Sequence, residues 1–230
     1  MRRNFEAGFT LIEVMIVVAI IAVIAAIAIP GLLRARISSN ETSAIGTLKS
    51  LATAQQQFQQ QCLVDQDFDG AGEYGVLQEM AGTVPCRASG LVADPTFMAV
   101  PFGTSAAVGV NGAASSSGYD VLVYLPNAIG IAMNERVLVA RGAVALDANV
   151  QESCWVAYAW PTDLESSGVR VFGVNQEGQV YQSSNALNRY DGAMNMVQGD
   201  AAFSVAGDIT GPMDVGGPGQ GGDPWLPVGG

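Results

Sequence analysis

The sequence contains no histidine and only one lysine, Lys49, among its 230 residues. Without histidine the chain lacks the commonest general base, the usual partner of a serine or cysteine nucleophile, and a frequent zinc ligand. We interpret Glu152, Asp163 and Glu165 as a solvated acidic face, and we expect that the protein is not an enzyme. The formal net charge of −11 repels phosphate backbones and disfavours nucleic acid as the primary ligand.

Charge is also nearly absent from residues 9–29. As a helix this run is about 31 Å long, which matches the hydrocarbon core of a bilayer. Arg2 and Arg3 precede it, so the positive-inside tendency places the N-terminus in the cytoplasm and exports the rest of the chain. The run is too long for the core of a signal peptide. A plain signal anchor fits the length but explains neither Gly8 before the run nor Glu13 within it.

The residues Gly8-Phe9-Thr10-Leu11-Ile12-Glu13 resemble the N-terminal signal of type IV pilins and of type II secretion pseudopilins. The resemblance implies cleavage after Gly8 by a prepilin peptidase and N-methylation of Phe9. It also implies that Glu13 forms an assembly salt bridge with the N-terminal amine of a neighbouring subunit. A buried carboxylate is tolerable when it is paired with a cation, and removing one partner costs about 3 kcal/mol or more.

The same resemblance implies an α+β, type IV pilin-like fold, with one long N-terminal helix packed on an antiparallel β-sheet head. We expect a kink or local melting of the helix at Pro30, because proline removes one helical hydrogen bond. The tail is predicted to be flexible from its composition, or else extended and docked through Trp225 and Leu226. The predicted divisions are a removed leader (1–8), a transmembrane or filament-core helix (9–29), an amphipathic helix half (30–61), a globular α+β head (62–210) and a Gly/Pro-rich flexible tail (211–230).

After Pro30 the pattern becomes amphipathic, which predicts that the helix continues to about Gln61 with one face toward the head. The stripe consists of Ile37, Ile45, Leu48, Leu51, Ala52, Gln55 and Phe58. Runs of β-branched and aromatic residues then predict strands at 96–102, 119–125, 154–160, 169–174 and 179–182. A hairpin turn is expected at 175–178 and a loop over 103–118.

Alternating aspartates follow the predicted helix and resemble the start of an EF-hand calcium loop, with Gly70 at the sixth position. The twelfth position, normally a bidentate glutamate, is Val76, so the match is partial. Two interpretations stay open, a Ca²⁺ site and a solvated acidic turn without a cofactor. The candidate ligands are Asp65, Asp67, Asp69 and Glu73.

All three cysteines lie on the predicted exported side, where disulfides persist. Cys62 and Cys86 enclose the acidic loop, and we predict a disulfide between them that contributes about 3 kcal/mol in the chain-entropy model. Cys154 begins an apolar strand and is predicted to be a buried thiol.

We therefore expect a structural subunit, made as a prepilin, of a type IV pilus-like filament that polymerises through the N-terminal helix. Its partners would be identical or related pilin subunits, the prepilin peptidase, and the pilus or secretion assembly machinery of the inner membrane. The protein would lie in that membrane with its head in the periplasm, and after assembly in a cell-surface pilus or periplasmic pseudopilus. Two alternatives stay open: a pseudopilin, and a membrane-anchored periplasmic binding domain with an uncut N-terminus.

Overall fold

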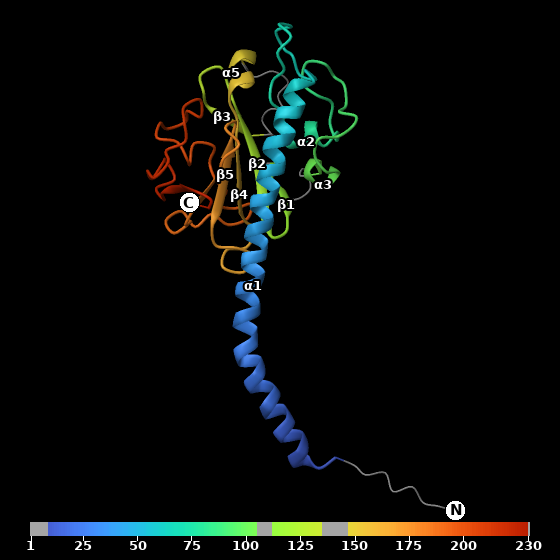
Figure 1. The fold of residues 1–230 in the computed structure, drawn as a ribbon, viewed down its shortest axis with the longest axis vertical. Coiled ribbons are helices and arrows are strands. Elements are labelled where there is room, and N and C mark those ends of the chain that lie inside the picture. The colour runs from blue at the N-terminus through green and yellow to red at the C-terminus, as the bar shows by residue number, and fades with distance from the viewer. Residues whose placement is uncertain (1–8, 105–111, 135–146, 230) are drawn as a thin grey trace, which may run out of the picture.

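The longest element is α1, a 50-residue helix over Leu11–Gln60. The computed structural model describes residues 9–104, 112–134 and 147–229, and the predicted leader therefore lies outside the described residues. The first half of α1, residues 11–33, projects from the head and is called the stalk below. The second half of α1 lies along the head (Figure 1). The helix ends one residue before the predicted boundary, and Cys62, two residues later, takes a positive φ of 49°.

The stalk is helical although it is rich in isoleucine and valine, which have only modest helix propensity in water. In a membrane every backbone N–H and C=O must be satisfied within the segment, and a helix achieves this. The helix continues through Pro30, so the local melting considered there is absent from this structure. The stalk is curved (Figure 1), and the kink at Pro30 stays a prediction.

The described part of the head contains an antiparallel sheet with the strand order β1-β2-β4-β5-β6-β7, and β3 pairs with β2. The predicted strands at 119–125, 154–160, 169–174 and 179–182 are confirmed as β2, β4, β5 and β6. The turn at 175–178 is confirmed as well, with Gly178 N donating to Asn175 O at 2.9 Å. The strands are β1 Ala114–Ser116, β2 Tyr119–Pro126, β3 Ala132–Asn134, β4 Val156–Pro161, β5 Val171–Asn175, β6 Val180–Ser183 and β7 Trp225–Pro227.

In the described part of the chain, three short helices flank this sheet: α2 Leu77–Met80, α3 Val100–Gly103 and α5 Ala148–Ser153. The strand predicted at 96–102 is wrong, because its second half forms α3. Pro101 lies in the first turn of α3, a position that suits proline and where a strand would lose a ladder donor. The loop predicted at 103–118 is interrupted by β1, and residues 105–111 of it lie outside the described residues.

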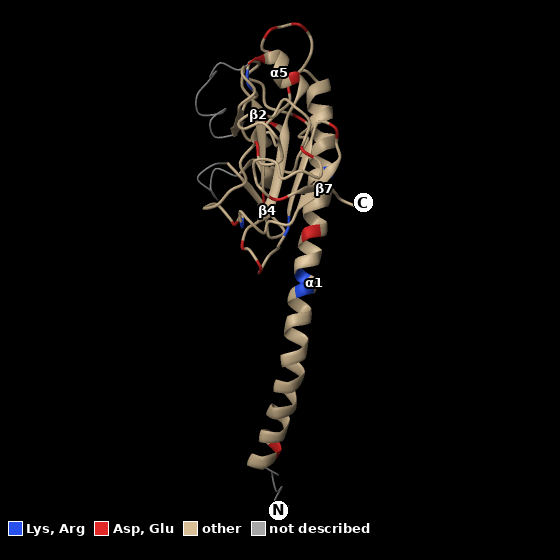
Figure 2. Ribbon diagram, turned by 90° about the vertical axis from the view of Figure 1, so that its left-hand side faces the viewer, with Lys and Arg blue, Asp and Glu red and all other residues tan. Residues whose placement is uncertain are grey.

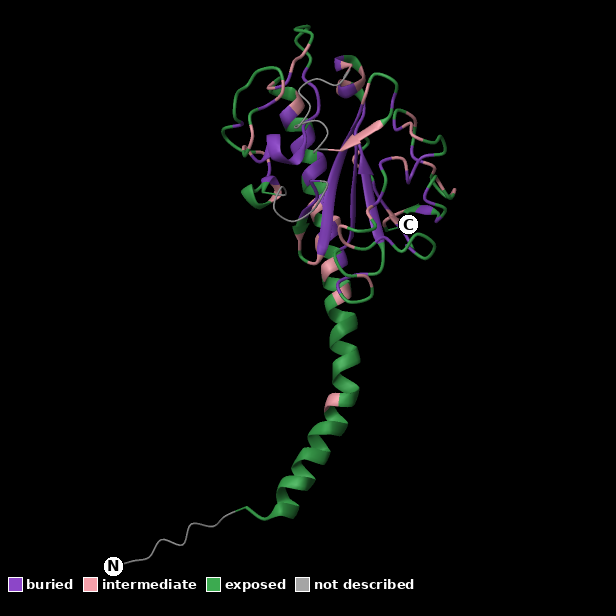
Figure 3. Cartoon of the chain, turned by 180° about the vertical axis from the view of Figure 1, so that it is seen from behind, coloured by how far each residue is buried: buried purple, intermediate pink, exposed green. Residues whose placement is uncertain are grey.

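Both faces of the sheet are buried, which explains why its strands have continuous apolar runs (Figure 3). Val121 and Val123 of β2 belong to the core that includes the second half of α1, whereas Leu122 and Tyr124 belong to the opposite core. This alternation follows from the two-residue period of a strand. The opposite core is completed by side chains from residues 190–213, which contain little regular structure.

The C-terminal segment is ordered against the head, so the flexible tail predicted for 211–230 is wrong over its described residues. β7 pairs with β6, with Trp225 opposite Ser183. The Trp225 side chain is buried, and its Nε1 donates to Ala201 O at 3.1 Å. One large aromatic ring buries enough surface to hold a segment that is otherwise glycine-rich. Leu226 remains half exposed, so the docking is through Trp225.

An ion pair joins α1 to the sheet where the stalk enters the head. Arg170 Nη2 lies 2.6 Å from Glu41 Oε2, and Glu41 Oε1 accepts the backbone N–H groups of Val169 and Arg170 at 3.3 and 3.2 Å. Glu41 is buried and Arg170 is partly exposed. Acidic residues are spread over the rest of the head, whereas the stalk is nearly free of charge (Figure 2).

Candidate functional site

The N-terminal end of α1 forms a capping box. Thr10 is the N-cap, and its Oγ1 accepts a hydrogen bond from Glu13 N at 3.3 Å. In return, Glu13 Oε2 accepts hydrogen bonds from Thr10 N at 2.8 Å and from Thr10 Oγ1 at 2.7 Å. The box satisfies backbone N–H groups that a helix leaves unpaired at its start. Phe9 precedes it and is exposed, whereas Gly8 lies outside the described residues.

The capping role of Glu13 was missed by the sequence analysis, although Thr-x-x-Glu before an apolar run is its signature. Glu13 therefore has a local reason for its position that does not depend on another subunit. Its hydrogen bonds within the described residues are made by Oε2. The salt bridge between Glu13 and a neighbouring amine stays a prediction.

The stalk presents apolar side chains on all its sides. Its large apolar residues are between 42 and 77% exposed from Leu11 to Leu33, and Glu13 is the single charged residue among them. The helix is long and apolar enough to cross a membrane. Burying one such side chain stabilises by roughly 1.5–3 kcal/mol, so this surface needs lipid or the apolar surfaces of other molecules around it.

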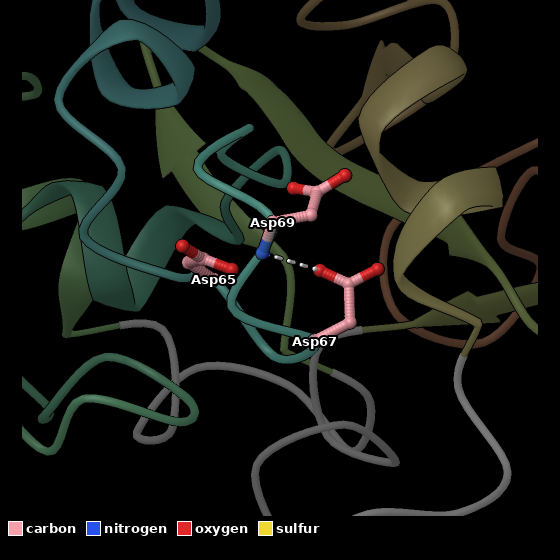
Figure 4. Close-up of side chains that lie close together, drawn as sticks. All are labelled: Asp65, Asp67 and Asp69. Atoms are coloured by element: carbon pink, nitrogen blue, oxygen red, sulfur yellow. Dashed lines mark hydrogen bonds between the residues drawn. The ribbon is translucent and has the colours of Figure 1, made fainter.

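The loop that follows α1 brings its three aspartates together (Figure 4). One carboxylate oxygen from each of Asp65, Asp67 and Asp69 lies within 4.8 Å of the others. Backbone N–H groups orient them: Asp69 N donates to Asp67 Oδ1 at 3.4 Å, Gly70 N to Asp65 Oδ2 at 3.3 Å, and Ala71 N to Asp69 Oδ1 at 2.8 Å. Gly70 has a φ of 89°, which glycine adopts without strain.

Glu73 lies against this loop and is wholly buried. Its Oε1 accepts a hydrogen bond from Gln66 N at 2.8 Å, and its Oε2 has no hydrogen-bond partner within the described residues. Burial raises the pKa of Glu73, and the charge of Asp65 adds to the effect. Asp65 Oδ1 is likewise buried without a partner.

Glu152 joins the same cluster from α5, contrary to its interpretation as part of a solvated face. Burial raises its pKa, and so do the negative charges of the three aspartates and Glu73. Its Oε1 is buried and has no partner in the described part of the chain. The backbone of α5 is tied to α1, because Gln59 Nε2 donates to Glu152 O at 2.6 Å. No local sequence pattern could have found this residue, since the tertiary structure brings it to the loop.

All three cysteines are free thiols, so the predicted Cys62–Cys86 disulfide is contradicted by the structure. The two side chains lie in different environments. Cys62 is exposed and its Sγ lies 3.3 Å from Gly70 O, whereas Cys86 is buried in the core that includes α1. Burial raises the pKa of Cys86 to about 11. Cys154 is a buried thiol, as predicted, and burial raises its pKa too.

Comparison with known proteins identifies the N-terminal segment. A model of the prokaryotic N-terminal methylation motif matches residues 3–29. The type IV major pilin protein PilA of Myxococcus xanthus is 42% identical over 87 residues, which are 38% of this chain and 39% of that protein. The N-terminal part of the chain is therefore similar to type IV pilins. The type IV wide pilus major component PilA4 of Thermus thermophilus is 48% identical to this chain over 52 residues, 23% of this chain and 40% of the relative.

A second family model covers most of the chain. The model described as protein of unknown function (DUF2950) matches residues 26–198, more than half of the chain, so the chain belongs to that family. The match runs from the second part of α1 through β6. No solved structure matches the chain. The chain spans about two fifths of the length of the curated relatives it matches.

Proposed function

We propose that this protein is a structural subunit of a type IV pilus-like filament, made as a prepilin and polymerised through α1. The observation that carries the proposal is the stalk, a helix that is apolar on every side and unburied by its own head. Lipid would cover this surface before assembly, and the stalks of other subunits would cover it afterwards. Type IV pilins are structural proteins, and we propose no catalytic role for this one.

Glu13 would give the filament its register. An ionised carboxylate inside an apolar medium costs roughly 2.5 kcal/mol or more, and a cationic partner offsets that cost. Cleavage between Gly8 and Phe9 would create such a cation, the new N-terminal amine. Pairing the amine of one subunit with Glu13 of the next would favour one stagger between neighbouring stalks over the others.

Before assembly the protein would lie in the inner membrane, with its head in the periplasm. The two arginines of the leader support this orientation, because positive charge is retained in the cytoplasm. A prepilin peptidase and the assembly machinery of that membrane would then be its partners, together with identical or related subunits. After assembly the head would form the outer surface of a cell-surface pilus.

A pseudopilin of a type II secretion system is the second candidate, since it would use the same signal and stalk. The names of the two relatives, a major pilin and a major component of a wide pilus, favour the surface pilus. An anchored periplasmic binding domain is disfavoured by the methylation-motif match, because that alternative requires an uncut leader.

The test is mass spectrometry of the N-terminal peptide in two fractions, filaments sheared from intact cells and membranes. We expect a chain that begins at methylated Phe9 in the sheared fraction. The same processed end in membranes alone would support the pseudopilin instead. An intact leader in both fractions would refute both filament functions.

A further inference from the structure

Negative charge gathers at the C-terminal end of α1, and among the described residues the cation that acts on Glu73 is Arg87. The guanidinium of Arg87 is already engaged. Its Nε lies 3.0 Å from Glu79 Oε1, its Nη1 donates to Gln151 Oε1 at 2.6 Å, and its Nη2 donates to Tyr74 O at 2.6 Å. The acidic cluster consists of Asp65, Asp67 and Asp69, whose carboxylate oxygens lie within 4.8 Å of one another, and of Glu73 and Glu152, which interact with them through their charges.

The side chain of Glu73 indicates that this cluster is built for a ligand. The residue is wholly buried, and the hydrogen bond from Gln66 N holds its carboxylate against the aspartate loop. Its Oε2, together with Asp65 Oδ1 and Glu152 Oε1, is buried without a hydrogen-bond partner in the described residues. Buried carboxylate oxygens in folded proteins normally meet a donor or a metal ion.

We propose that this cluster binds one Ca²⁺ ion through Asp65, Asp67, Asp69 and Glu73, with Glu152 as a further ligand from α5. Calcium takes six to eight oxygen ligands at about 2.3–2.6 Å, so two ligands of one ion lie up to about 5 Å apart. The three aspartate oxygens meet this condition, at 4.8 Å or less from one another. Zn²⁺ prefers nitrogen and sulfur ligands, and Mg²⁺ requires a nearly ideal octahedron of ligands. Ca²⁺ is therefore the ion that suits a flexible loop of carboxylates best.

The loop follows the EF-hand pattern at its start and departs from it at its end. Gly70, at the sixth position, makes the sharp turn that such loops require. The twelfth position is Val76, which is buried in the core and offers no ligand. Glu73 at the ninth position and Glu152 from a separate helix would replace the missing glutamate. The ion would thereby join the end of α1, the loop and α5.

Gly72 keeps the loop in place beside α1. A Cβ at this position would collide with the carbonyl oxygen of Gln59 and would lie 2.9 Å from Cys62 Cα. The backbone of the loop therefore packs directly on the last turn of the helix. Calcium binding does not depend on the proposed filament role, since the cluster lies wholly within the head.

The test uses the full-length protein in detergent, stripped of metal with a chelator and titrated with CaCl₂ in a calorimeter. We expect one site with an affinity in the range of extracellular calcium modules, Kd about 10⁻⁴–10⁻³ M, and weaker binding of Mg²⁺. Saturating Ca²⁺ is expected to raise the Tm by several degrees, because the ion binds the folded state alone.

Two ligand variants and one matched control sharpen the test. Asp67→Asn changes an exposed side chain, and Glu73→Gln keeps the shape of a buried one, so both are expected to fold. Each is expected to weaken Ca²⁺ binding by about tenfold or more and to abolish the rise in Tm. Asp163→Asn removes the same charge from an exposed position outside the cluster and is expected to bind Ca²⁺ like the wild type.

Three results would overturn the proposal. The first is no binding by the wild type at millimolar Ca²⁺. The second is equal binding by the wild type, both ligand variants and the control, which would indicate nonspecific attraction to an acidic surface. The third is Mg²⁺ binding as tight as Ca²⁺ binding, which would contradict the choice of ion.

Discussion

The two halves of α1 belong to one continuous helix but have opposite surroundings. The stalk is apolar on all sides and exposed, whereas the second half buries one face against the sheet through Leu48, Leu51 and Phe58. Even a polar side chain is satisfied there, because Gln55 exchanges two hydrogen bonds with the backbone of Gly75, at 2.7 and 2.9 Å.

This contrast teaches that the two halves serve different equilibria. Contacts of the second half decide whether the head folds, because they lie within one chain. In the proposed filament subunit, contacts of the stalk would be made with other molecules, so they would decide insertion and assembly. Folding and assembly should therefore respond to different substitutions in the same helix.

The largest effect is expected from Glu13→Gln in the stalk. Glutamine at this position can keep the capping box but carries no charge to pair with a neighbouring amine. Leaving that amine unpaired costs about 3 kcal/mol per contact, so the amount of sheared filament should fall by about 100-fold. The measurement is an immunoblot of the sheared fraction against the membrane fraction.

Thr10→Ala is the matched control for this substitution. It removes the N-cap, at a cost of about 1 kcal/mol to the helix end, and keeps the Glu13 charge. Filaments should therefore largely persist. Equal loss in both variants would mean that Glu13 acts through its cap rather than through its charge.

Leu48→Ala and Ile20→Ala compare the two halves directly. Leu48 is wholly buried, and its truncation should lower the free energy of unfolding by about 3 kcal/mol. Ile20 is 55% exposed, and its truncation should change the stability of the head by less than about 0.5 kcal/mol. Urea unfolding reports on the head alone, because all three tryptophans are buried there. A destabilised head in Ile20→Ala would show that the stalk contributes to folding after all.

Glu41→Ala tests the ion pair at the junction of the two halves. The substitution leaves Arg170 and two backbone N–H groups without their acceptor, which should cost about 2 kcal/mol. The control is Glu165→Ala, which breaks the pair of Glu165 with Arg189; those side chains are 69 and 60% exposed. An exposed pair contributes about 0–1 kcal/mol, so urea unfolding should separate the two variants clearly.

The smallest intervention is thiol labelling. It tests both cysteine predictions, the Cys62–Cys86 disulfide and the buried thiol of Cys154. In the folded protein a maleimide should modify Cys62 alone, because Cys86 and Cys154 are buried and their thiol pKa values are raised. After unfolding, three thiols should react. A single reactive thiol in the unfolded protein would instead establish the Cys62–Cys86 disulfide.

The sequence by itself determined the stalk, the amphipathic stripe and four strands of the sheet. These features depend on local periodicity, which is set by the geometry of a helix or a strand. The sequence also contains the signatures of the Thr10–Glu13 capping box and of the turn at Gly70, because the residues of each feature lie close together along the chain.

The tertiary structure alone decided which groups meet across the fold. It placed Glu152 beside the aspartate loop, buried Glu73, docked Trp225 on β6 and kept Cys62 apart from Cys86. Segment 96–102 is not a strand, because the Phe97 and Met98 amides donate to Met80 O, at 2.9 and 3.2 Å, and the residues from Val100 form α3. Such choices depend on the free energy of contacts between residues distant in sequence, which local propensity does not contain.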